Sequence, residues 1–175
     1  IRHIQRDLAL PGSVGSDQIS PLIKDPSGQI WVGTWGGGLQ RYLSGNKTFH
    51  MLRHRTGSSY SLSNPDVRSL LEAEENTIWI GTAGRGINAV RINDNQTLEF
   101  LPSPDTRLQL QNEFISAMAK TVDQSIWVAT QSNGLYRYIS TDAGFRAITI
   151  EQGLSTNQIK TLEASQNGNL WIGSN

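Results

Sequence analysis

A short pattern of apolar and polar positions recurs along the chain: an apolar residue, a tryptophan, a second apolar residue, a small residue and a hydroxyl residue. It first occurs at 30–34 and returns at 78–82, 126–130 and 170–174. The tryptophans of this pattern are spaced by 48, 48 and 44 residues. A period of this length predicts a repeat protein such as a solenoid or a propeller.

The second copy shows what one repeat contains. Residues 67–71 are predicted to form a first strand. A turn is predicted before it, because Pro65 cannot be part of a central strand. The β-branched and aromatic residues at 78–82 predict a second strand. Gly84 and Gly86 permit the positive φ of a tight reversal into a third strand at 87–90, and a polar loop leads to a fourth at 98–101. Each repeat is therefore predicted to be a four-stranded antiparallel meander.

Both faces of such a sheet are apolar, because successive side chains of a strand point to opposite faces. One meander cannot bury both faces alone, whereas sheets stacked around an axis can. We therefore predict an all-β fold, a β-propeller fragment of about four blades that is incomplete at both ends. The repeated tryptophans are predicted to fill the core between blades: Trp31, Trp79, Trp127 and Trp171.

The predicted segments are a partial blade at 1–15, blades at 16–62, 63–109 and 110–153, and a partial blade at 154–175. Residues 1–4 match the fourth strand of an earlier repeat, and the last segment supplies only a first and a second strand. The chain also begins at Ile1. We therefore expect a piece of a larger ring, whose uncovered apolar end faces predict dimerisation or aggregation.

Charge and composition exclude several classes of partner. The 15 basic and 15 acidic residues give a formal charge of zero, which argues against nucleic acid or an anionic membrane surface. No run approaches the roughly 18 apolar residues of a membrane helix, and no signal peptide opens the chain. Any membrane attachment is therefore expected outside this segment. The absence of cysteine excludes disulfides, thiol catalysis and thiolate metal sites.

The tryptophan pattern, the turn Asp25 to Gly28 before it, and the runs Leu39 to Tyr42 and Leu135 to Tyr138 after it resemble the two-component regulator propeller repeat. Three full copies and one partial copy cover nearly the whole chain. The resemblance implies the periplasmic part of a bacterial sensor whose other regions hold one membrane helix and a histidine kinase or diguanylate cyclase. It further implies a small molecule or oligosaccharide as ligand, and a second propeller or a homodimer as partner.

Antiparallel strands bring two sets of loops to one rim: those that lead into a first strand and those that join a second strand to a third. We predict this rim as the binding surface. Asn, Asp and Ser before a strand usually bond their own backbone, but a ring of them also suits hydroxyl-rich ligands. The candidate ligand-binding residues are Asp17, Trp35, Asn64, Asp66, Arg85, Asn112, Glu113, Gln131 and Asn157.

Trp35 is the one tryptophan outside the repeated position. An exposed loop tryptophan can stack on a sugar or anchor a partner, since it offers a large rigid face. Packing over the neighbouring blade is the interpretation that the sequence favours over these binding roles. Arg85 is predicted either to hold an anionic group or to be solvated.

No residue set predicts catalysis. Asp66 and Glu113 come from adjacent repeats, but nothing around them predicts the perturbed pKa that paired-carboxylate hydrolysis requires. The histidines have no acidic cluster beside them, so we predict no metal site and no cofactor. The leading hypothesis is a non-enzymatic sensor that binds a ligand or a second propeller at its rim. The alternatives are a propeller enzyme, a glycoside hydrolase or lyase acting on polysaccharide, and a purely structural dimerising array.

Overall fold

The computed structural model describes residues 3–58, 60–74, 76–93, 97–105, 107 and 109–174. Within these residues the regular structure is all strand, apart from a 3-10 turn at Ile150–Gln152. The strands form four antiparallel sheets in chain order. They are β1 (Ile19–Lys24), β2 (Ile30–Thr34), β3 (Gly38–Leu43) and β4 (Thr48–Leu52); β5 (Val67–Glu72), β6 (Thr77–Thr82), β7 (Ile87–Ile92) and β8 (Leu98–Leu101); β9 (Ile115–Lys120), β10 (Ile126–Thr130), β11 (Leu135–Ser140) and β12 (Gly144–Ile148); and β13 (Ile159–Ala164) with β14 (Leu170–Ser174).

Each sheet is one blade, and the second blade matches the predicted meander strand for strand. Its strands pair in the order β5-β6-β7-β8. The predicted turn between its first two strands includes Glu75, which lies outside the described residues. Around it, the backbone N–H of Ala73 donates to the Thr77 carbonyl at 2.9 Å, and Asn76 takes a φ of 57°. A polar residue that tolerates the left-handed region thus closes the turn.

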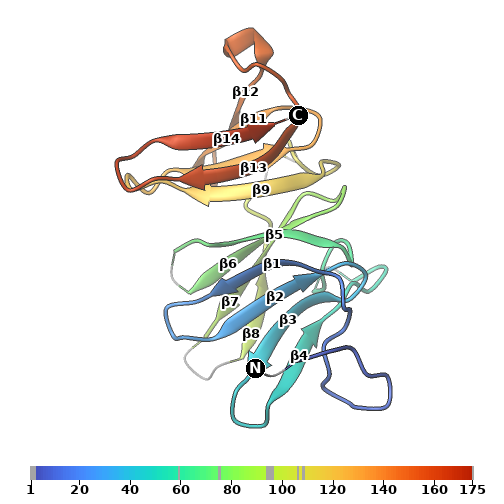
Figure 1. The fold of residues 1–175 in the computed structure, drawn as a ribbon. Helices are drawn as coiled ribbons and strands as arrows, with labels where there is room; N and C mark the ends of the chain where they lie inside the picture. Colours follow the sequence, from blue (N-terminus) through green and yellow to red (C-terminus); the bar gives the residue numbers. More distant parts are fainter. Residues whose placement is uncertain are drawn as a thin grey trace.

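The blades stack so that the first strand of each is innermost. Strand β1 packs against β5, β5 against β9, and β9 against β13, in a row through the middle of the molecule (Figure 1). Three apolar clusters fill the spaces between successive blades. Trp31 and Trp79 are buried in the first and second clusters, whereas Trp127 is partly buried and packs against the third. Because apolar side chains from both faces of the second and third sheets enter these clusters, the fold is the predicted stack of propeller blades.

Trp171 departs from the predicted core role. Its side chain is 65% exposed, and Ile172 beside it is 40% exposed. Each repeated tryptophan faces the blade that follows it, and no sheet of the described chain covers this face of β14. At the opposite end of the stack, Leu22 of β1 is 61% exposed, whereas its counterpart Leu70 in β5 is buried against the first blade.

The N-terminal segment differs from the predicted strand at 1–4. Ile1 and Arg2 lie outside the described residues, and residues 3–7 form no strand. The chain instead turns between Asp7 and Ser13, and the Phe49 N–H donates to the Gly12 carbonyl at 2.7 Å. This segment therefore lies along the outer edge strand β4 of the first blade. The described residues include no helix long and apolar enough to cross a membrane.

Candidate functional site

The predicted rim is joined between blades by a repeated backbone hydrogen bond. A glycine at the start of each third strand donates its N–H to a carbonyl in the loop that leads into the next blade: Gly38 to Pro65 (3.0 Å), Gly86 to Glu113 (3.1 Å) and Gly134 to Asn157 (2.9 Å). All three glycines have positive φ. A Cβ at Gly86 would lie 2.6 Å from the Leu110 carbonyl oxygen. The reversal therefore needs glycine for both conformation and space.

The asparagines of the rim serve as turn formers. Asn64 accepts the Asp66 N–H through Oδ1 (2.8 Å) and donates from Nδ2 to the Ala83 carbonyl (2.7 Å). Asn157 accepts the Ile150 N–H at 2.9 Å. These side chains hold the loops in place, as expected for an Asx residue before a strand. Asn112, in contrast, is exposed.

The three carboxylates of the predicted rim set accept hydrogen bonds from neighbouring segments. Asp66 accepts the Gly36 N–H of the first blade at 2.6 Å, and Glu113 accepts a hydrogen bond from Asn133 Nδ2 at 2.7 Å. Asp17 accepts the Arg6 N–H at 2.7 Å. Each carboxylate thus has a structural partner.

Trp35 packs against the neighbouring blade and stays partly open to solvent. Its side chain is 44% exposed, and the Arg68 guanidinium carbon lies 3.6 Å from its ring centroid. The same carbon lies 4.8 Å from the ring centroid of Phe114. One arginine of β5 therefore contacts an aromatic ring from the first blade and another from the third. Such contacts over ring faces are favourable for a guanidinium.

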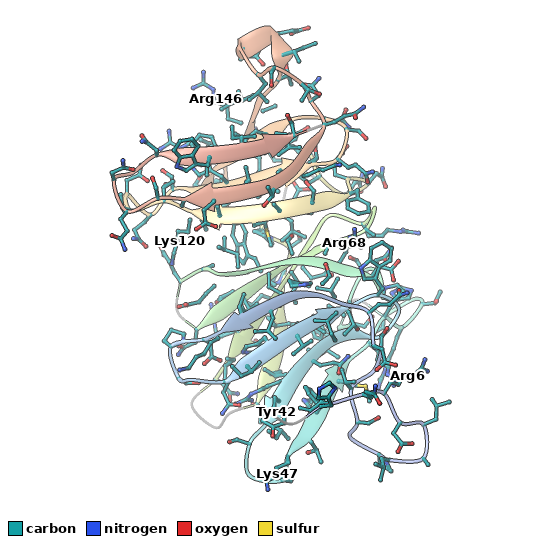
Figure 2. All side chains as sticks on the ribbon, viewed as in Figure 1. Arg6, Tyr42, Lys47, Arg68, Lys120 and Arg146 are labelled. Atoms are coloured by element: carbon teal, nitrogen blue, oxygen red, sulfur yellow. The ribbon has the colours of Figure 1, made fainter. Side chains whose placement is uncertain are left out.

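A cavity of about 500 Å³ opens beside this arginine. We call it the inner-strand cavity, because residues of all four innermost strands line it: Ser20, Arg68, Ser116 and Lys160. Figure 2 shows Arg68 at the boundary between the second and third blades, at the opposite end of that boundary from Lys120. Gln131, on the rim loop of the third blade, also lines the cavity. It is the single member of the predicted binding set that does so.

Two polar atoms of the cavity residues are buried without a partner. Arg68 Nη1 and Ser116 Oγ make no hydrogen bond within the described part of the chain. Burial lowers the pKa of the Arg68 guanidinium from its usual value, and the nearby charge of Asp66 acts in the opposite direction. Unpaired buried polar groups are rare in folded proteins and call for an explanation such as a bound ligand or water.

The predicted binding set did not include Arg68, Ser116 and Lys160, the two cations and one of the hydroxyl residues that line the inner-strand cavity. The missing signal was their shared position: each is the second residue of an innermost strand, as is Ser20. Comparing copies position by position would have shown two cations and two hydroxyls in one ring. Arg85, which was predicted either to hold an anionic group or to be solvated, is exposed on the rim and does not line the cavity.

Histidines and acids form no evident metal centre in the described residues. No group of three such side chains lies close enough together there to hold an ion. His54 instead places Nδ1 2.7 Å from the Leu62 carbonyl oxygen, which fixes the loop after β4.

Comparisons with known proteins place this geometry in a wider context. The family model described as two component regulator propeller matches residues 61–84 and 153–175. The extracellular domain of BT4673 from B. thetaiotaomicron, described as belonging to a hybrid two component system, is 28% identical with a TM-score of 0.71, covering 91% of this chain and 20% of that chain. The corresponding domain of BT3049 is 24% identical with a TM-score of 0.74, covering 93% and 21%. A search of curated proteins found no similar sequence.

A more distant likeness concerns the fold alone. Virginiamycin B lyase from Staphylococcus aureus is 17% identical with a TM-score of 0.61, covering 89% of this chain and 48% of that chain. The present chain spans about a fifth of the length of the two extracellular domains that it matches.

Proposed function

Because the chain carries two-component regulator propeller repeats, we propose that it forms part of the extracytoplasmic, periplasmic propeller of a bacterial transmembrane signalling protein. We further infer that this propeller senses a small molecule or oligosaccharide and performs no catalysis in this segment. The similarity to extracellular domains of hybrid two component systems supports the location and the role. The output domain is proposed to be a histidine kinase or a diguanylate cyclase.

One observation carries the proposed ligand binding. Two residues that line the inner-strand cavity each carry a buried polar atom, Arg68 Nη1 and Ser116 Oγ, that no described residue satisfies. Leaving such a group unpaired costs about 1–3 kcal/mol, and more for a charged group. A ligand that bonds both atoms recovers this free energy, whereas a purely structural array gains nothing from keeping them unpaired.

The exposed end faces support the proposed partner. Trp171 and Ile172 at one end, and Leu22 at the other, occupy positions that contact a neighbouring sheet elsewhere in the stack. Further blades of the same kind fit these faces, in line with the greater length of the matched extracellular domains. A homodimer is the alternative partner. Light scattering of the chain before and after Trp171→Ser tests the proposal, since the variant should self-associate less.

A thermal-shift screen tests ligand sensing. The purified chain is mixed with panels of neutral oligosaccharides, sugar acids and small carboxylates, and the unfolding midpoint is followed. At least one class should raise the midpoint of the wild type, and Ser116→Ala should reduce the shift. Ser155→Ala is the matched control, because Ser155 is exposed and lies outside the cavity.

The same mixtures also test the enzyme alternative. Chromatography after incubation should recover each ligand unchanged. Release of shorter products by the wild type would replace the sensor with a hydrolase or lyase. In a full-length protein that contains this segment, the ligand should change kinase or cyclase output, and Ser116→Ala should weaken that response.

A further inference from the structure

Three of the four innermost strands have a register shift at the same position, and the fourth has one in a stretch that includes that position. In β5, Val67 pairs with Thr82 and Ser69 with the adjacent Gly81, so that Arg68 has no partner in the ladder. The same shift occurs in β9, around Ser116, and in β13, around Lys160. In β1 the shift falls between Ile19 and Leu22, a stretch that includes Ser20. A bulge re-aims a side chain and is common beside functional sites.

The bulged residues converge on one space and carry one kind of chemistry. All four line the inner-strand cavity, two of them as cations and two as hydroxyls. No acidic residue is among the described residues that line it. Gln131 and Gln158 line the same cavity. The lining is therefore rich in hydrogen-bond donors and has a positive charge that nothing in the lining offsets.

Arg68 is held in place before any ligand arrives. Its guanidinium lies over the ring of Trp35 at 3.6 Å and near the ring of Phe114 at 4.8 Å, both measured to the ring centroid. The nearby carboxylate of Asp66 accepts the Gly36 N–H and does not line the cavity. A fixed guanidinium fork matches the oxygens of a carboxylate, sulfate or phosphate group, and little side-chain entropy remains to be lost on binding.

We propose that the inner-strand cavity binds an oxyanion, a carboxylate, sulfate or phosphate group carried by the ligand, through Arg68, Ser116 and Lys160. This inference rests on the proposed function for the role of the cavity as the sensing site, and it adds the chemical class of the ligand. The Arg68 fork and the Ser116 hydroxyl bond the anion directly. Lys160 contributes charge at the open side, where its side chain is exposed.

Nuclear magnetic resonance of the five tryptophan indoles provides the test. The chain is titrated separately with sodium sulfate, sodium phosphate and sodium acetate at constant ionic strength, and Trp35→Phe assigns the Trp35 signal. At least one anion should move the Trp35 indole signal along a saturable curve, because Trp35 stacks on Arg68. The Trp31 signal should stay in place, because that indole is fully buried and bonded to Asp25. Acetate carries a planar carboxylate, whereas sulfate and phosphate are tetrahedral. Comparison of the three titrations therefore shows which of the two shapes the site binds better.

Variants make the test quantitative. Arg68→Gln should weaken the best anion roughly tenfold or more, since a charge-assisted hydrogen bond is lost. Lys160→Gln should weaken it about two- to fivefold, as expected for an exposed charge. Lys160→Gln keeps the test valid if Arg68→Gln disturbs the stacking of blades. Arg53→Gln is the matched control, because Arg53 is exposed and lies outside the cavity.

The outcomes separate this inference from the proposed function. If no anion moves the Trp35 signal while a neutral ligand from the thermal-shift screen does, the oxyanion assignment is wrong and the sensing proposal stands. If neither has an effect, both fail. Equal weakening by Arg53→Gln and Lys160→Gln would indicate a general charge effect and would also overturn the assignment.

Discussion

The repeated tryptophan is held by different contacts in the first and second blades. In the first blade, Trp31 is fully buried and donates its indole N–H to Asp25 Oδ2 at 2.8 Å. The guanidinium carbon of Arg41, which pairs with it in the ladder, lies 5.8 Å from its ring centroid. In the second blade, Trp79 is 6% exposed, and the residue that pairs with it is Ala89. The ladder position that Arg41 holds in the first blade is thus taken by an alanine in the second.

Aromatic rings of the third blade contact Trp79 instead. Tyr138 meets its ring edge-on, with centroids 5.0 Å apart at 87°, and Phe145 lies at 6.2 Å. At the position of Asp25 the second blade has Ala73, whose side chain carries no hydrogen-bond acceptor. The first boundary is thus anchored by polar contacts within a blade, and the second by aromatic contacts between blades. The repeat specifies where the tryptophan lies and leaves its partners free to vary.

Removal of either tryptophan should break its boundary and have the largest effect. Trp31→Ala and Trp79→Ala should each lower the free energy of unfolding by about 3–5 kcal/mol, because a large buried ring is lost and a cavity remains. Trp171→Ala is the matched control and should lose less than about 1 kcal/mol, since that ring is 65% exposed. Urea unfolding measures all three, at a protein concentration where light scattering shows no self-association. A large loss at Trp171 would show that its exposed face is covered in solution.

Asp25→Ala should remove the side-chain acceptor of Trp31 and so make the first boundary resemble the second, where alanine stands at this position. The indole N–H of Trp31 would then be buried without its acceptor, at about 1–3 kcal/mol. The control is a double-mutant cycle with Trp31→Phe, which has no N–H to satisfy. In the Phe background, Asp25→Ala should cost clearly less. Equal costs in both backgrounds would show that Asp25 acts only through its own turn, where Ser27 and Gln29 also donate to it.

The aromatic contacts of the second boundary predict a smaller effect. Tyr138→Phe first removes the hydroxyl contact with Thr141. The further step from Phe to Leu should cost about 0.5–1.5 kcal/mol beyond the loss of area, because the edge-to-face contact with Trp79 is lost. Tyr42 is the counterpart in the first blade, where no preceding described blade presents a tryptophan, and among the described aromatic rings it contacts Phe49. Changing Tyr42 to Phe and then to Leu should therefore cost less.

The period-two pattern of β6 and β10 was sufficient to predict the blades and their stacking. Alternation places Ile78 and Ile80 on one face and Trp79 on the other, and the structure buries them in different clusters. The role of Trp171 could not be predicted in the same way, because burial depends on a neighbouring sheet and not on the strand itself. Local pattern thus predicts which face a side chain takes, and it does not predict whether that face is covered.

The candidate site was less accessible from the sequence for a physical reason. A bulge interrupts the alternation at Arg68, Ser116 and Lys160, so a pattern of period two does not give their direction. The rim loops drew attention because polar residues gather there, yet Asn64 and Asn157 bond backbone groups. Turn formation and ligand binding favour the same residue types. Only the contacts of the folded chain separate the two uses.

The smallest expected difference between the two boundaries is their response to acid. Burial alone would raise the pKa of Asp25, but hydrogen bonds from the side chains of Ser27 and Trp31 and from backbone N–H groups hold it below its usual value. Because the folded pKa is depressed, this stabilisation is fully present above the unfolded pKa of about 4 and is lost as the pH falls through the folded pKa. The free energy of unfolding should therefore be level above about pH 5 and decline below about pH 4. Asp25→Asn should flatten part of that decline, whereas Ala73→Asn, at the equivalent position of the second blade where no carboxylate is present, should leave its slope unchanged. An unchanged slope in Asp25→Asn would mean that other carboxylates, such as Asp123 with its hydrogen bonds from Thr121 and Ser125, account for the acid response.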